Sequence, residues 1–181
     1  MARDVAHWIA QLNSTDLMQK AQAAESLARL GDAVKPAAVA LAKEAGSADE
    51  TVREWVVSAL ESLGPPRPGD VESLKELVAS EREETAYWAI TLLGRLESIA
   101  APAVPELIQE LNENPHPHNR QRAAWALGKI GPAAAAALPD LKAAAHSPDR
   151  RMARIALLAI QSISESEQQP DQNALGMSSP L

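Results

Sequence analysis

Apolar positions along the chain recur with a helical spacing and also with a longer period of about 33 residues. The segments ESLARLG, SALESLG and WALGKIG end at Gly31, Gly64 and Gly131, and weaker copies end at Glu97 and Ser164. Successive markers are 33, 33, 34 and 33 residues apart. A fixed period of this length is typical of proteins built from repeated supersecondary units.

Each repeat predicts two helices. Positions one, four and eight residues before every marker hold Leu, Ile, Val or Ala, which together form one face of an α-helix. Seventeen residues before the marker lies a side chain that can bond backbone N–H groups at a turn, namely Ser14, Ser47, Ser80, Asn114 and Ser147. The predicted helix pairs are 3–13 with 16–30, 34–45 with 50–63, 70–79 with 82–96, 102–113 with 119–130, and 134–145 with 150–163.

Glycine and proline punctuate these helices. The glycines at 31, 64 and 131 suit the left-handed conformation that ends a helix. Four prolines fall early in the first helices of their units, where a missing N–H is tolerated: Pro36, Pro102, Pro105 and Pro139. Of these, Pro105 and Pro139 are predicted to lie deeper and to tilt their helices.

A single helix pair cannot bury both of its apolar faces, so the units must stack. The predicted fold is therefore all-α, an α-solenoid of about five antiparallel helix pairs over residues 1–164. About one residue in five is alanine and only 3% are aromatic, which favours closely packed helices over a sheet. Residues 165–181 lose the pattern and are rich in Gln, Ser and Pro, so we predict a disordered tail.

Two segments, SADETVREWVVSALESLG at 47–64 and NPHPHNRQRAAWALGKIGP at 114–132, carry a family resemblance. They resemble the HEAT repeat family, in particular the short HEAT-like repeats associated with phycobilin lyases. The resemblance implies a solenoid whose second helices line a concave surface. It also implies a partial ladder between repeats, with an acidic column at Asp16, Asp49 and Asp149 and a basic column at Lys20, Arg53 and Arg120.

The composition removes several kinds of chemistry. The chain has no cysteine, which excludes disulfides, thiolate nucleophiles and Cys-ligated metals. We find no phosphate-binding loop, no nucleophile elbow, and no histidine followed by glutamate. His116 and His118 could clasp a metal, but a polar loop is the favoured interpretation. We therefore expect no catalysis and no cofactor.

Charge and hydropathy restrict the environment and the partners. No run of 18 apolar residues and no signal peptide is evident, so we expect a cytoplasmic protein without a membrane span. The net charge of −7 argues against general nucleic-acid binding. The charge is segregated, however: residues 1–114 carry a net −9 and residues 115–160 a net +5. Such a basic end can orient an encounter with a partner.

The candidate functional surface lies on the second helices, on a face other than the apolar one. Three of the four tryptophans fall there, together with several basic residues, and these types are enriched at binding hot spots. The predicted partner-binding residues are Trp55, Trp88, Trp125 and Arg122, supported by Tyr87, Arg95 and Lys129. For Trp55 and Trp88, packing between repeats is the competing interpretation.

The leading functional hypothesis is a non-enzymatic scaffold or adaptor that binds a protein or peptide through this surface. The resemblance implies an alternative, an accessory protein of a phycobilin lyase-like system. A third possibility is nucleic-acid binding through the basic C-terminal repeats. We expect a monomer or a weak homodimer.

Overall fold

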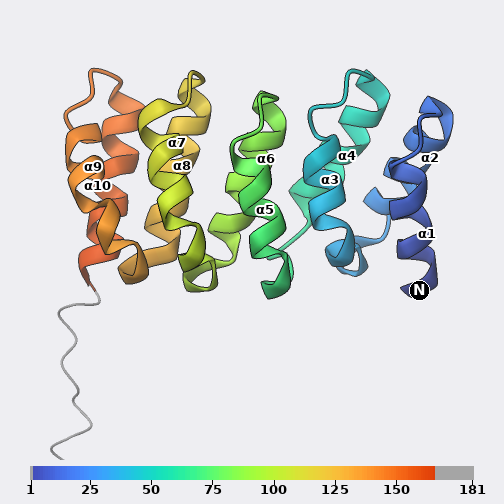
Figure 1. Cartoon of the computed structure of the whole chain (residues 1–181), viewed down its shortest axis with the longest axis horizontal. Helices are drawn as coiled ribbons and strands as arrows, with labels where there is room; N and C mark the ends of the chain where they lie inside the picture. Colours follow the sequence, from blue (N-terminus) through green and yellow to red (C-terminus); the bar gives the residue numbers. More distant parts are fainter. Residues whose placement is uncertain (1, 166–181) are drawn as a thin grey trace, which may run out of the picture.

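The computed structural model describes residues 2–165, which form ten α-helices and no strand. The helices make five antiparallel pairs that stand side by side in a row (Figure 1). The pairs are α1 (Ala2–Leu12) with α2 (Leu17–Ala28), α3 (Ala38–Glu44) with α4 (Glu50–Ser62), α5 (Val71–Val78) with α6 (Glu83–Arg95), α7 (Val104–Glu113) with α8 (Pro117–Ile130), and α9 (Leu138–Ala144) with α10 (Arg150–Glu165). The predicted all-α solenoid is confirmed. The predicted tail, apart from Glu165, lies outside the described residues.

Most first helices start later than predicted, because a 3-10 segment precedes them. These segments are η1 (Gly31–Ala37), the short η2 (Pro68–Asp70), η3 (Glu97–Ala103) and η4 (Gly131–Ala137). The α-helices that follow therefore begin at 38, 71, 104 and 138. As a result, Pro105 and Pro139 occupy the second position of their α-helices, where an N–H has no intrahelical partner. The prediction that these two prolines lie deep in their helices was wrong.

The predicted turn residues behave alike in all five repeats. Each side-chain oxygen accepts a hydrogen bond from the backbone N–H two residues further on, over 2.8–3.4 Å. This turn aims the chain into the second helix, which Asp16 and Asp49 then cap by accepting from first-turn N–H groups. The turn prediction is confirmed by Ser14, Ser47, Ser80, Asn114 and Ser147.

The acidic and basic columns do not form the expected ladder within the described residues. Arg53 donates to the carbonyl of Ser47 at 2.9 Å, and Arg120 donates to that of Asn114 at 3.2 Å. Lys20 pairs with Glu44 of α3 at 2.8 Å. The reason is local, because the acidic column accepts from backbone N–H groups at helix starts and the basic arginines bind loop carbonyls.

The apolar columns form the core. Residues one, four and eight before each marker are buried, except Leu30 and Ile160, which are half-buried. The leucines ten residues after the markers, Leu41, Leu74, Leu107 and Leu141, are fully buried. Because these residues meet across adjacent repeats, the core is continuous along the row.

Adjacent second helices approach closely where the residue three before the marker is small. A Cβ atom on Gly94 would overlap the Trp125 ring, and one on Gly128 would lie 2.8 Å from Ala159 Cα. Helix α6 therefore packs against α8, and α8 against α10. The equivalent residue between α2 and α4 is Ala28, and those two helices also pack closely.

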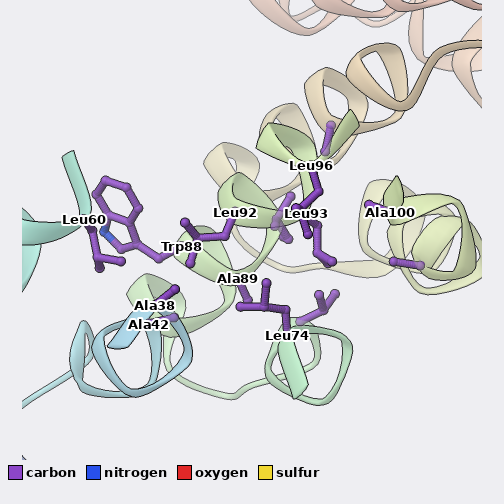
Figure 2. Packing of buried hydrophobic residues seen from close by; sticks show 14 of the residues in the cluster. Ala38, Ala42, Leu60, Leu74, Trp88, Ala89, Leu92, Leu93, Leu96 and Ala100 are labelled. Atoms are coloured by element: carbon purple, nitrogen blue, oxygen red, sulfur yellow. The ribbon is translucent and has the colours of Figure 1, made fainter. Parts of the chain in front are cut away.

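The row of second helices opens between repeats 2 and 3. There the small residue is replaced by Glu61, and α6 packs mainly against α3 instead of α4. The Trp88 indole extends from α6 towards Leu60 of α4 and occupies this opening (Figure 2). Arg95 closes it at the helix end, where its Nη1 donates to the carbonyls of Leu60, at 2.7 Å, and Leu63.

One marker position is conformationally strained. Gly31 and Gly131 have positive φ angles of 54° and 73°, but a ψ of −142° places Gly131 outside the left-handed helical region predicted for it. Gly64 has no positive φ, because Leu63 already leaves α4 in an extended conformation. In repeat 3 the marker is Glu97, the one non-glycine residue with positive φ in the described part of the chain, at 52°.

We expect Glu97→Gly to stabilise the protein by about 0.5–1 kcal/mol. The free energy gained by removing the strain of a left-handed non-glycine residue exceeds the free-energy cost of the greater conformational entropy that glycine has in the unfolded chain. Urea denaturation followed by circular dichroism measures the change. Glu97→Ala is the control: if alanine stabilises equally, loss of the carboxylate rather than the backbone conformation is responsible.

Candidate functional site

The second helices carry a series of arginine–aromatic contacts from repeat 1 to repeat 4. At the N-terminal end, the Arg29 guanidinium lies 5.9 Å from the Trp55 ring centroid. At the opening between repeats 2 and 3, Arg95 lies 5.7 Å from the Trp88 centroid. Trp88 is only 8% exposed, and Trp55 is half-buried. The burial of Trp88 beside Leu60 favours the packing interpretation for that side chain.

The densest contact joins α6 and α8. The Arg122 guanidinium contacts two rings and lies 4.5 Å from the centroid of Tyr87 and 4.9 Å from that of Trp125. Arg122 Nη2 also donates a hydrogen bond to Tyr87 Oη. The missing side chain at Gly94 gives the Trp125 ring its place against α6. All three stacked side chains remain half-exposed, so the stack is fixed in position yet open to a ligand.

Two adjoining hollows extend from this stack towards α10, and we call them together the α8–α10 groove. The first, of about 140 Å³, is lined by Tyr87, His118, Gln121, Arg122, Trp125, Arg151 and Ile155. The second, of about 250 Å³, is lined by Trp125, Gly128, Lys129, Ile155, Leu158, Ala159 and Ser162. Trp125 and Ile155 belong to both, so the groove is continuous along the two helices.

The groove is cationic at one end and largely apolar at the other. Arg122 and Arg151 line the first hollow, Leu158 is 54% exposed beside the second, and no carboxylate lines either. Burial lowers the pKa of Arg95, and the positive charge of Arg122 lowers it further, against smaller opposing effects of Tyr87 and Glu61. The cations on this face therefore repel one another.

Asp149 precedes the start of α10 but does not line the groove. Asp149 accepts a hydrogen bond from Gln121 Nε2 at 2.7 Å and one from the Arg151 backbone N–H at 2.9 Å. The bond from Gln121 is the main reason that the pKa of Asp149 is lowered, followed by the backbone bond. Asp149 thus fixes the start of α10 relative to α8 and lines a different surface hollow, with Asp140.

The structure divides the predicted binding residues into two sets. Four of them meet at the α8–α10 groove: Tyr87, Arg122, Trp125 and Lys129. The other three, Trp55, Trp88 and Arg95, lie towards repeats 1–3 and line neither hollow. The sequence hypothesis missed the α10 side of the groove, although Ile155 and Leu158 share the repeat columns of Trp88 and Trp125.

The described residues contain neither a metal-binding cluster nor a membrane-spanning helix. His116 Nδ1 lies 3.1 Å from Glu83 Oε2, and residues 2–165 contain no group of three or more His, Asp or Glu side chains placed to hold a metal ion. Within the same residues, no helix has the length and apolar character needed to cross a membrane.

The stacked helix pairs and the groove on their second helices define an α-solenoid repeat protein. A family model of HEAT repeats matches residues 5–94 and 71–163. Because these matches cover most of the chain, the protein belongs to the HEAT repeat family. Comparison with curated proteins gives no match.

Solved structures of similar architecture include natural and designed repeat proteins. A chain in the complex of CpcE and CpcF of phycocyanin lyase from Nostoc sp. PCC7120 is 25% identical, with a TM-score of 0.61; the match covers 87% of this chain and 64% of that chain. An engineered protein is 23% identical, with a TM-score of 0.66 and coverage of 89% and 79%. A designed armadillo repeat protein in complex with the peptide (KR)4 is 18% identical, with a TM-score of 0.58 and coverage of 89% and 87%.

A double-mutant cycle tests the stack. We expect Tyr87→Leu and Arg122→Gln to show a coupling free energy of roughly 0.5–2 kcal/mol in urea denaturation, because each change removes the same cation–π contact and hydrogen bond. The control cycle pairs Tyr87→Leu with Lys129→Gln, for which we expect additive effects. Additivity in the first cycle would show that the stack contributes nothing to stability.

Proposed function

We propose that this protein is a non-catalytic scaffold that binds a protein or peptide partner through the α8–α10 groove. The observation that carries the proposal is the half-exposed stack of Tyr87, Arg122 and Trp125, which adjoins an open apolar hollow. Tyr, Trp and Arg are the residues that most often dominate binding energy when they sit together in a fixed arrangement. Packing against α6 and the bond to Tyr87 hold the stack in place before a partner arrives.

The form of the groove supports a polypeptide ligand. Both hollows are only partly enclosed, so they suit side chains of an extended segment better than a small molecule that must be surrounded. The second hollow also presents an exposed apolar side chain, that of Leu158, at 54% exposure. Structures with this architecture bind other polypeptides, such as CpcF in the phycocyanin lyase complex and (KR)4 in the designed armadillo protein.

The likeness to the phycocyanin lyase chain favours one second candidate, an accessory role in a phycobilin lyase-like system. In that case the purified protein should alter the visible absorbance of added bilin, because a bound tetrapyrrole changes its conformation and surroundings. An unchanged spectrum at saturating protein would remove this candidate and leave the scaffold proposal unaffected.

A display selection tests the scaffold proposal. A random twelve-residue peptide library is selected against the full chain, and the enriched peptides are measured by fluorescence anisotropy. We expect Trp125→Ala and Leu158→Asp each to weaken binding at least tenfold, because they remove an aromatic anchor and place a charge in the apolar hollow.

Leu157→Asp is the matched control, since Leu157 is 58% exposed, adjoins Leu158 in sequence and lies outside the groove. We expect it to bind like the unaltered protein. Failure to enrich any groove-dependent peptide, or equal losses at the two leucines, would overturn the proposal that the groove is the binding site.

A further inference from the structure

The charge along the α8–α10 groove specifies a partner more narrowly than its shape does. Its first hollow presents Arg122 and Arg151 with no carboxylate in the lining, although the chain as a whole has a net charge of −7. Neither arginine forms a side-chain ion pair with a carboxylate among the described residues. Arg122 therefore keeps donor capacity that its contacts with Tyr87 and Trp125 do not use.

The second hollow has a mainly apolar lining and therefore suits an apolar group. Ile155, Leu158 and Ala159 of α10 face Trp125 and Gly128 of α8 across it, and Lys129 lies at its edge. From Arg122 to Lys129 the chain rises about 10 Å along α8, a distance that an extended peptide covers in about three residues. A carboxylate in the first hollow and a leucine-sized side chain in the second can thus belong to one extended segment, within about three residues of each other.

We propose that the groove binds an extended segment of a partner protein in which Asp or Glu lies within about three residues of a leucine-sized apolar residue. This rests on the proposed function and adds the partner's chemistry. The carboxylate pairs with Arg122 and Arg151, and the apolar side chain fills the space between Trp125 and Leu158. An acidic ligand also offsets the repulsion between Arg95 and Arg122, which adds to the effect of burial in lowering the pKa of Arg95 in the free protein.

Charge segregation favours a short acidic segment over a nucleic acid. Residues 115–160 carry a net +5, whereas residues 1–114 carry a net −9. A long polyanion lying along the second helices would leave the basic repeats and run over the acidic ones, where it is repelled. Phosphates would also leave the apolar hollow beside Leu158 unfilled.

Four fluorescein-labelled peptides test the proposal against the full chain: GSDDLDDLGS, GSNNLNNLGS, GSKKLKKLGS and GSDDSDDSGS. We expect the acidic leucine peptide to bind best in anisotropy titrations at low salt. Its amide counterpart should be about tenfold weaker, the serine version several-fold weaker, and the lysine version without measurable binding. Raising the salt concentration should weaken only the acidic peptides.

Neighbouring residues supply the matched variants. Arg151→Gln and Arg122→Gln should each reduce the preference for the acidic over the amide peptide by about three- to tenfold, whereas Arg150→Gln should leave it unchanged. Arg150 has the same charge and an adjacent position but lies outside the groove. Leu158→Ser should reduce the preference for leucine over serine, and Leu157→Ser should not.

The outcomes separate this proposal from the scaffold proposal. If groove-dependent peptides are selected from the random library but carry no acidic residues, the partner's chemistry is wrong and the scaffold proposal stands. Equal effects of Arg150→Gln and Arg151→Gln would also overturn it, because they would show only general attraction. A thymidine dodecamer that binds more tightly than the acidic leucine peptide would overturn it in favour of single-stranded nucleic acid.

Discussion

The second helices of this solenoid approach one another only where a side chain is nearly absent. Gly94 and Gly128 allow α6, α8 and α10 to pack closely, and Ala28 does the same for α2 and α4. The geometry of the proposed binding groove depends on this spacing. Close packing against Gly94 positions Trp125, and the contact at Gly128 sets the width of the groove between α8 and α10.

Arg122 is held by neighbouring side chains yet remains half-exposed. Its guanidinium is held against two rings and by the Tyr87 hydroxyl, so little side-chain freedom remains to be lost on binding. Across the groove, the bond between Gln121 and Asp149 fixes the start of α10. The site therefore combines positioned cations with an apolar hollow.

Sequence periodicity predicted the helix pairs, the turn residues and the buried columns, because all of these follow from local spacing. Periodicity did not predict the 3-10 segments. They follow the marker residues, and where each subsequent α-helix starts depends on the backbone conformation of the chain there. The opening between repeats 2 and 3 had a visible signal, Glu61 in a column of small residues, but its consequence required the packing of α6 on α3. In the groove, aromatic and charged residues stood out, whereas Ile155 and Leu158 share their surface columns but carry ordinary aliphatic side chains, which gave no sign of a binding site.

The opening at Glu61 also shapes how the molecule comes apart. In a linear array, stability is a sum over repeats and nearest-neighbour interfaces, so cooperativity fails first at the weakest interface. Here α4 and α6 are joined through side chains, Trp88 and Arg95, and the rest of the interface is mainly the contact of α6 with α3. We therefore expect repeats 1 and 2 to unfold as one cooperative block and repeats 3 to 5 as another. The groove lies wholly within repeats 3 to 5, so it should persist when repeats 1 and 2 unfold.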